Sequence, residues 1–350
     1  MKVVFLFAIT LATIWADMPL KKPHHYNSAV NDEMVQGIRS KSPTWQAYEP
    51  GENPLRNYTD AQLKYLSSMP KVDYEGHMKK LAETQETIKH LFASPDSDKK
   101  LKASPEERLR AVTLPTNYDW RTTDDGKRCT PKVQSQGSCG SCYAFATAIV
   151  FAARYCQVRT GAAVIDYSPQ DLLTCSVRTS GCDGGLFEEA LTYLEEYGIT
   201  TLACKPYLEM NSPSDATPKQ RCVSTKCASG DPIGKSYCKK GTSIVLYGKD
   251  RIKYEITQRG PIGTAMIVYD DLMSYKSGIY KSVQGAKQGG HAIVLFGWGL
   301  DTSVTPNIEY WLVMNTWGDD WGESGYFRID MTDTRSQLGE AGYYCIPEVA

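Results

Sequence analysis

Residues 136–145 read QGSCGSCYAF and place one cysteine, Cys142, where a Gly- and Ser-rich coil turns into an apolar segment. That segment continues as an Ala-rich run with recurring bulky apolar residues, which predicts a helix over residues 141–158. A thiol at a helix N-terminus meets the positive end of the helix dipole and unpaired backbone N–H groups, so its pKa is expected to fall. Cys142 is therefore a candidate nucleophile.

The spacing of Cys139 and Cys142 leaves other interpretations open. C-x-x-C is shared by zinc sites and thioredoxin-like redox motifs, and either cysteine can also be half of a disulfide. Zinc would need a second ligand pair of similar spacing, and the gap between Cys222 and Cys227 is too wide for a second C-x-x-C. A redox role would need a surrounding βαβ pattern, which is missing. We expect neither a metal nor a cofactor.

Histidine is scarce, with five residues in the chain. Four of them precede residue 91, so His291, in residues 289–293 (GGHAI), is the one imidazole in the cysteine-containing part of the chain. If an imidazole of that part activates Cys142, it must be His291. Asn315, in residues 315–318 (NTWG), supplies an amide that can hydrogen-bond the imidazole and fix its tautomer.

The arrangement of segments predicts an α+β fold. Residues 186–197 form a second amphipathic helix pattern. Short β-branched and aromatic runs separated by Gly, Asp and Pro then predict strands at residues 242–247, 264–269, 292–298, 310–314 and 325–329. A helical part followed by an antiparallel part favours a functional site in a cleft between them.

The N-terminal third differs from the rest. Residues 1–16 have the basic start, short apolar run and small final residue of a cleaved signal peptide, and no other apolar stretch approaches membrane length. Residues 17–113 are polar, carry the sequon of Asn57 as a candidate glycosylation site, and end in a charged linker. All eleven cysteines lie in residues 114–350, which favours an oxidising compartment and leaves one thiol over.

The balance of charge argues against polyanionic partners. The chain has 39 basic and 40 acidic side chains and a formal net charge of −1. No long-range field therefore attracts nucleic acid or an anionic membrane surface.

Together, residues 136–145, 289–292 and 315–318 resemble the papain-like cysteine peptidases, a likeness that covers most of residues 114–350. Residues 204–207 (CKPY), 259–262 (RGPI) and 275–280 (YKSGIY) are similar to the cathepsin B type, and residues 44–47 (TWQA) resemble its propeptide. The resemblance implies a two-lobed monomer, with a helical N-terminal lobe and an antiparallel β-barrel-like C-terminal lobe. Residues 17–113 would be an inhibitory pro-region.

By the same resemblance, Cys142 attacks the peptide carbonyl while His291 holds the thiolate and later protonates the leaving amine. Asn315 orients His291, and Trp317 shields their hydrogen bond from water. Gln136 and the backbone N–H of Cys142 form the oxyanion hole.

Further expectations concern substrate binding. Gly184 and Gly185 would pair their backbone with an extended substrate, and Tyr343 would form the floor of the S2 pocket, favouring apolar P2 residues. Residues 207–222, where cathepsin B carries the paired histidines of its occluding loop, contain no histidine. We therefore expect mainly endopeptidase activity on peptide and protein substrates.

The resemblance also implies disulfides that pair Cys129 with Cys156, Cys139 with Cys182, Cys175 with Cys222 and Cys204 with Cys227. It leaves Cys238 and Cys345 open. The expected product is a secretory-pathway zymogen, in a lysosome-like acidic vesicle or outside the cell. A catalytically inactive papain-like binding protein and a thiol-disulfide oxidoreductase are the alternatives.

Overall fold

The computed structural model describes residues 27–67, 113–208, 222 and 225–349. The expected signal peptide, the charged linker and most of the loop at residues 207–222 lie outside the described residues. The helices, short 3-10 turns included, are α1 (Asp32–Lys41), α2 (Asp60–Tyr65), η1 (Trp120–Thr122), α5 (Asp124–Cys129), α6 (Cys142–Val158), α7 (Pro169–Cys175), η2 (Gly181–Asp183), α8 (Phe187–Glu196), α9 (Lys249–Arg259) and η3 (Asp270–Ser274).

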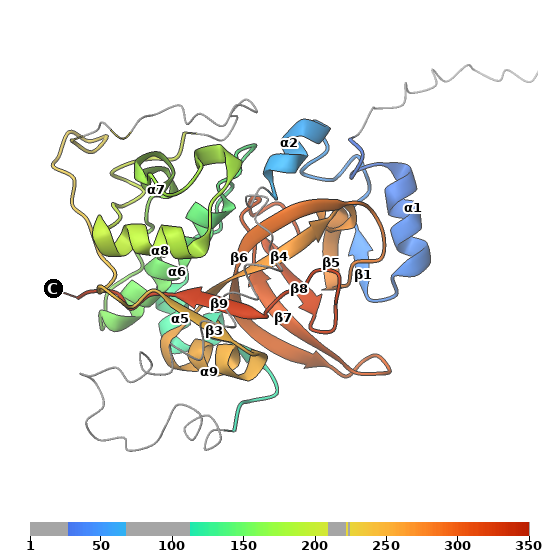
Figure 1. Ribbon diagram of the computed structural model, residues 1–350. Coiled ribbons are helices and arrows are strands. Elements are labelled where there is room, and N and C mark those ends of the chain that lie inside the picture. Colours follow the sequence, from blue (N-terminus) through green and yellow to red (C-terminus); the bar gives the residue numbers. More distant parts are fainter. Residues whose placement is uncertain (1–26, 68–112, 209–221, 223–224, 350) are drawn as a thin grey trace, which may run out of the picture.

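One lobe is helical and is built around α6 (Figure 1). This helix is buried along almost its whole length and contacts α5, α7 and α8 as well as strands of the neighbouring lobe. The start of α7 follows from its sequence: the Ser168 hydroxyl accepts a hydrogen bond from the N–H of Asp171, and Pro169 occupies the first helical turn. Only one stripe of the amphipathic helix α8 is buried.

The other lobe is a sheet. Its strands are β1 (Trp45–Ala47), β2 (Tyr118–Asp119), β3 (Ile244–Tyr247), β4 (Ile262–Tyr269), β5 (Tyr275–Tyr280), β6 (Lys287–Asp301), β7 (Ile308–Met314), β8 (Tyr326–Asp330) and β9 (Ala341–Tyr344). They follow the order β1-β5-β8-β7-β6-β4-β9-β3, with β2 paired to β6. Among the described strands the pairs are antiparallel, except for β5 and β8, which are parallel.

The expected α+β arrangement, a helical lobe beside a largely antiparallel β lobe, is confirmed. The sheet adds two details that the sequence did not indicate. It has two ends, at β1 and β3, and it contains the parallel pair β5–β8. Strands β6, β7 and β8 follow one another in the chain and alternate in direction. Strand β8 therefore runs in the same direction as β6, and it pairs with β5 in parallel. The strand with His291 also begins at Lys287, earlier than the run of apolar residues indicates.

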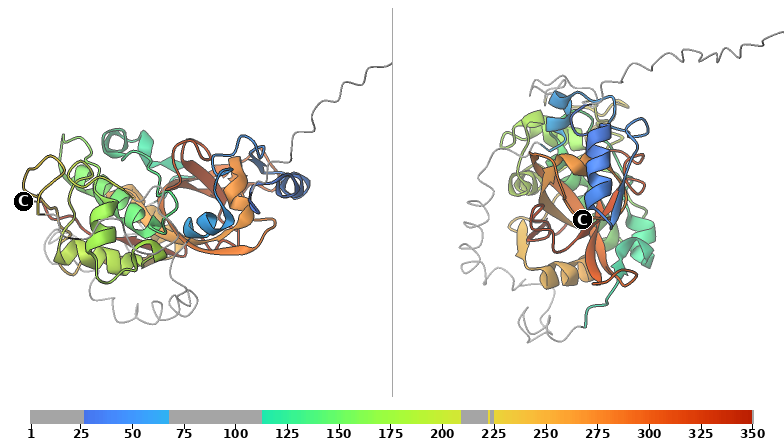
Figure 2. Two further views of the ribbon diagram at one scale, coloured as in Figure 1. Left: turned by 90° about the horizontal axis from the view of Figure 1, so that it is seen from above. Right: turned by 90° about the vertical axis from the view of Figure 1, so that its right-hand side faces the viewer.

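The N-terminal segment adds a strand to this sheet. β1 pairs with β5, and Trp45 is buried against Tyr275 and Tyr280, with ring centroids 6.1 Å and 5.2 Å away. The N-terminal segment, drawn in blue in Figure 2, thus lies on the β lobe, and Asn57 is exposed on it. A backbone strand pairing of this kind fixes the segment without needing a particular side chain at every position.

A buried ion pair joins the two lobes. Arg154 of α6 contacts Glu255 of α9 at 2.8 Å, and their side chains are 3% and 4% exposed. The Arg154 guanidinium also donates to the carbonyl of Pro261 at 2.8 Å and lies over the ring of Tyr344. Because each charge is compensated, the pair fixes the position of α6 against the β lobe.

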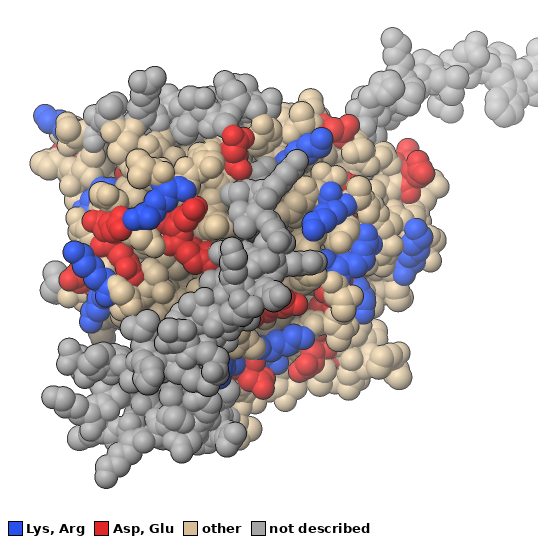
Figure 3. Space-filling view, viewed as in Figure 1, with Lys and Arg blue, Asp and Glu red and all other residues tan. Residues whose placement is uncertain are grey.

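On the face seen in Figure 3, basic and acidic side chains are interspersed over both lobes. Within the part of the chain that is described, no helix has the length and apolar character needed to cross a bilayer.

Candidate active site

Cys142 is the first residue of α6 and is completely buried. Its sulfur accepts a hydrogen bond from the N–H of Ala292 in β6, at 3.5 Å. The other ten cysteines form disulfides, so Cys142 carries the one free thiol. The contact with Ala292 places the thiol beside the strand that carries His291.

His291 is held by the pairing of β6 with β7. Val294 lies opposite Met314 in that pairing, which brings Asn315, just after β7, back toward His291. The His291 Nε2 lies 2.7 Å from Asn315 Oδ1, an oxygen that also accepts from the N–H of Thr316 at 2.8 Å. Since this oxygen can only accept, Nε2 carries the proton of a neutral His291 and Nδ1 offers a lone pair.

Nδ1 of His291 is buried and has no hydrogen-bond partner among the described residues. The Trp317 ring stacks on the imidazole with centroids 5.0 Å apart, and both side chains are buried. A buried imidazole with one nitrogen held and the other unpaired is arranged to accept a proton at that second nitrogen.

The side chain of Gln136 is fixed at both ends. Its Oε1 accepts from the hydroxyl of Thr316 at 2.6 Å, and its Nε2 donates to the carbonyl of Cys139 at 2.9 Å. Because the Cys139 carbonyl can only accept, Nε2 must face it, and Oε1 then faces the hydroxyl of Thr316. Thr316 lies inside the NTWG motif, but its role could not be predicted from the sequence. This role depends on a contact with Gln136, which lies 180 positions away in the chain.

The N-terminal segment covers this site with backbone carbonyls. Gln136 Nε2 donates to the carbonyl of Tyr65 at 3.2 Å, and Trp317 Nε1 donates to that of Leu66 at 3.3 Å. The carbonyl oxygen of Ser67 lies so close to Gly289 that a β-carbon there would meet it at 2.2 Å. Gly289, two residues before His291, thus gives room for a chain to pass directly over the strand.

Burial governs the charge state of Cys142 and His291. Desolvation raises the pKa of Cys142 to about 11, although the N–H groups of Ala292, Tyr143 and Cys142 act in the opposite direction. Desolvation likewise lowers the pKa of His291 to about 4, against the effect of the Asn315 hydrogen bond. The lowered thiol pKa expected from the helix dipole is therefore wrong for this covered state, in which thiol and imidazole are both neutral.

Gly184 and Gly185 follow η2, next to the disulfide that joins Cys182 to Cys139. The carbonyl of Cys182 accepts from the N–H of Gly140, so this loop lies against the coil that leads into α6. Gly184 has a φ of 110°, a conformation that requires glycine. Tyr343 is buried in β9, where its ring stacks on that of Phe187 with centroids 4.9 Å apart.

The four disulfides that the resemblance implied are present in the structure, which also joins Cys238 to Cys345. Cys139 is bonded to Cys182 and is therefore not available to pair with Cys142 or to bind zinc beside it. No cluster of three metal-binding side chains occurs within the described ranges.

Comparison with known proteins agrees with this geometry. The model of the papain family cysteine proteases matches residues 114–346. The chain is 37% identical over 229 residues to the cathepsin B-like protein CP3 of Giardia intestinalis, covering 65% of this chain and 73% of that protein. A gut-specific cysteine proteinase of Caenorhabditis elegans is 33% identical over 306 residues, covering 80% and 90%.

A solved structure extends the likeness to the N-terminal segment. The procathepsin B S9 structure from Trypanosoma congolense superposes with a TM-score of 0.72 at 26% identity, over 92% of this chain and 99% of that one. With the family model matching two thirds of its length and relatives named as cathepsin B-like, this chain belongs to the papain family of cysteine proteases.

Proposed function

We propose that this chain hydrolyses peptide bonds through Cys142, His291 and Asn315. The thiol proton moves to Nδ1 of His291, and the sulfur bonds to the substrate carbonyl carbon. The imidazolium then protonates the leaving amine as the C–N bond breaks, and water attacks the resulting thioester to release the acid and free Cys142. The main support for this proposal is the His291 Nε2–Asn315 Oδ1 bond of 2.7 Å, which leaves Nδ1 unpaired on the strand against which the free thiol of Cys142 lies.

Gln136 would stabilise the oxyanion of the tetrahedral intermediate. Its Nε2 already donates to a peptide carbonyl, that of Tyr65, which supports a role as a donor to the substrate oxygen. The N-terminus of α6 adds the N–H of Cys142 as the second donor.

Residues 17–113 would keep the enzyme latent. Solved proforms among its structural relatives support this, since the procathepsin B S9 structure superposes over 92% of this chain. The backbone carbonyls of residues 65 and 66 accept the side-chain hydrogen bonds of Gln136 and Trp317. The buried thiol of Cys142 and the imidazole of His291 are neutral. Removal of the segment readmits water, which lowers the desolvation cost and favours the thiolate-imidazolium pair.

Endopeptidase activity is the proposed mode, because residues 207–222 carry no histidine to bind a substrate carboxylate. The phenolic ring of Tyr343 would favour apolar P2 residues. We propose Gly184 and Gly185 as backbone partners of the substrate, and delivery to an acidic vesicle or the extracellular space through residues 1–16.

One set of peptide substrates tests both the endopeptidase mode and the preference for apolar P2 residues. Peptides that differ only in a blocked or free C-terminus, and in Leu or Arg at P2, are given to the chain after removal of the pro-region. We expect faster cleavage of the blocked peptides and of those with Leu. Equally fast removal of dipeptides from free C-termini would contradict the endopeptidase mode, and preference for Arg would contradict the role of Tyr343.

A further inference from the structure

Tyr207 lies in a segment that is anchored on α7, away from the catalytic residues in sequence. The Ser168 hydroxyl donates to the carbonyl of Lys205 at 2.6 Å, and the N–H of Leu208 donates to Gln170 Oε1 at 3.0 Å. Tyr207 is thus held from both sides by side chains at the start of one helix.

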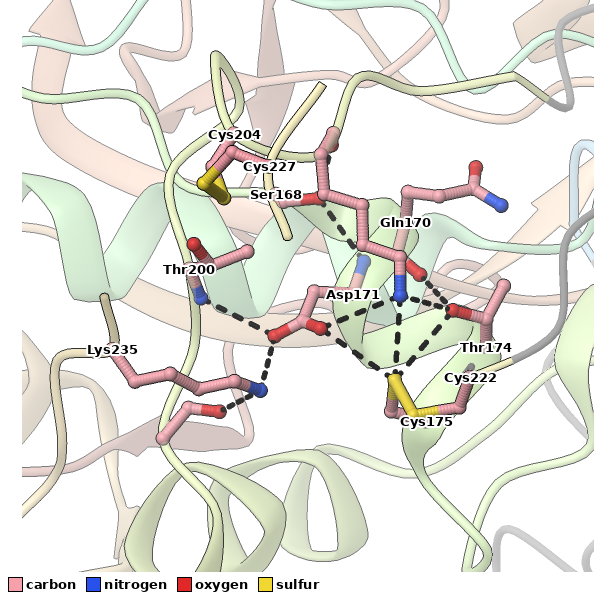
Figure 4. Close-up of polar contacts among 12 residues, drawn as sticks. Ser168, Gln170, Asp171, Thr174, Cys175, Thr200, Cys204, Cys222, Cys227 and Lys235 are labelled. Atoms are coloured by element: carbon pink, nitrogen blue, oxygen red, sulfur yellow. Dashed lines mark hydrogen bonds and ion pairs between the residues drawn. A yellow bond between two sulfur atoms is a disulfide. The ribbon is translucent and has the colours of Figure 1, made fainter. Parts of the chain in front are cut away.

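That helix is itself fixed by a buried carboxylate. Figure 4 shows the Asp171 carboxylate between Thr200, which donates its N–H at 3.2 Å, and Lys235, whose Nζ lies 2.7 Å away. Lys205 adds a second ammonium, 3.5 Å from the carboxylate, and Cys204 next to it is bonded to Cys227. The backbone before Tyr207 is therefore built as a rigid support.

The hydroxyl of Tyr207 reaches from this support into the catalytic region. It donates to the backbone carbonyl of Gln136 at 2.8 Å and lies 2.8 Å from the hydroxyl of Ser141. Because its single proton goes to a carbonyl that can only accept, the Ser141 hydroxyl is the donor in the second contact. The ring packs edge-on against Phe145, one turn into α6, with centroids 4.7 Å apart.

The contact with Ser141 has a consequence for the N-terminus of α6. Serine at an N-cap usually accepts a hydrogen bond from an N–H of the first helical turn. Ser141 is the N-cap of α6, yet its side chain makes no such bond. The Ser141 hydroxyl lies against Tyr207 instead, so it does not take up the N–H groups of Cys142 and Tyr143.

We propose that Tyr207 is a positioning residue for the oxyanion hole. Its hydroxyl ties the carbonyl of Gln136 to the hydroxyl of Ser141, and so fixes the distance between the two oxyanion donors, the Gln136 amide and the backbone N–H of Cys142. This inference rests on the proposed function and adds a residue to it.

The test is Tyr207→Phe, which removes the hydroxyl and keeps the ring on Phe145. After identical removal of the pro-region and active-site titration, we expect kcat to fall about tenfold with KM within about twofold, the loss typical of one hydrogen bond that acts in the transition state. A peptide aldehyde adds to the thiol and places its oxygen in the oxyanion hole, so its Ki is expected to rise by the same factor. Alkylation of Cys142 by iodoacetamide needs no oxyanion hole and is expected to keep its rate.

Tyr167→Phe is the matched control, because it removes a hydroxyl that donates to Ser236 at 2.9 Å in the same lobe. We expect it to leave kcat unchanged. The inference is overturned if Tyr207→Phe behaves like this control, or if its alkylation rate falls as far as kcat does. Gln136→Ala distinguishes a failure of the proposed oxyanion hole from a failure of the role of Tyr207. Full activity of Gln136→Ala refutes the oxyanion hole. Loss of activity in Gln136→Ala, with full activity in Tyr207→Phe, refutes only the role of Tyr207.

Discussion

Replacing Trp45 by Ala in the full-length chain should release the pro-region from the active site. Trp45 is 4% exposed, packs on Tyr275 and Tyr280, and donates its indole N–H to the carbonyl of Lys281 at 3.0 Å. Truncation of a buried Trp to Ala costs about 3–5 kcal/mol. With one decade for every 1.4 kcal/mol, the population of open proenzyme should rise by about two to three and a half orders of magnitude.

The free thiol reports this opening directly. Cys142 is completely buried and the other ten cysteines are in disulfides, so iodoacetamide has one target in the native chain. When opening and closing are fast compared with alkylation, the alkylation rate follows the open population. We therefore expect alkylation of Cys142 in Trp45→Ala to accelerate by about 10²- to 4 × 10³-fold, as the same conversion of 3–5 kcal/mol gives.

A control on the same strand separates opening from a general loss of structure. Gln46 is exposed beside Trp45 in β1, and Gln46→Ala should alkylate at the wild-type rate. Circular dichroism should show that both variants stay folded. If Trp45→Ala reacted no faster than Gln46→Ala, strand β1 would not be what keeps Cys142 covered.

Three further outcomes follow from the site and the core. Gln136→Ala should lower kcat by about two to three orders of magnitude with little change in KM, as measured with a fluorogenic peptide; an unchanged kcat would remove Gln136 from the oxyanion hole. Glu255→Gln leaves Arg154 buried and unpaired, so the free energy of unfolding in urea should fall by about 3–5 kcal/mol, and the double variant with Arg154→Met should regain much of it. Burial lowers the pKa of His291 from 6.5 to about 4, so the unfolded chain binds the proton first and the proenzyme should lose up to about 3 kcal/mol between pH 6.5 and 4. In His291→Gln the free energy of unfolding in urea should change less between pH 6.5 and 4. The same pH dependence in the wild type and the variant would contradict the lowered pKa of His291.

The residues with reactive side chains could be predicted from sequence because they occur in short motifs. Cys142 follows a Gly- and Ser-rich coil, and His291 is the single histidine after residue 90, so few alternatives remained. Helices α6 and α8 were also predictable, since their apolar periodicity is strong. By contrast, α9 was not predicted, although Ile252 and Ile256, four residues apart, form its buried stripe.

Contacts through backbone atoms could not be predicted. The carbonyls of Tyr65 and Leu66 cover the active site whatever side chains they carry, so no residue type marks them. The same holds for Tyr207, whose hydroxyl acts on a backbone carbonyl. The charge state of the Cys142 thiol was mispredicted for a related reason. The position of Cys142 at a helix N-terminus can be read from the sequence, whereas its desolvation in the folded chain cannot.

Cys142 is the proposed nucleophile of a peptidase. After removal of the pro-region, the chain is titrated with a thiol-specific epoxide, and the labelled residue is identified by mass spectrometry while peptide hydrolysis is followed in the same samples. We expect one label per chain, on Cys142, with activity lost in proportion to labelling. Hydrolysis that persists in the fully labelled chain, or that survives in Cys142→Ala, would contradict it.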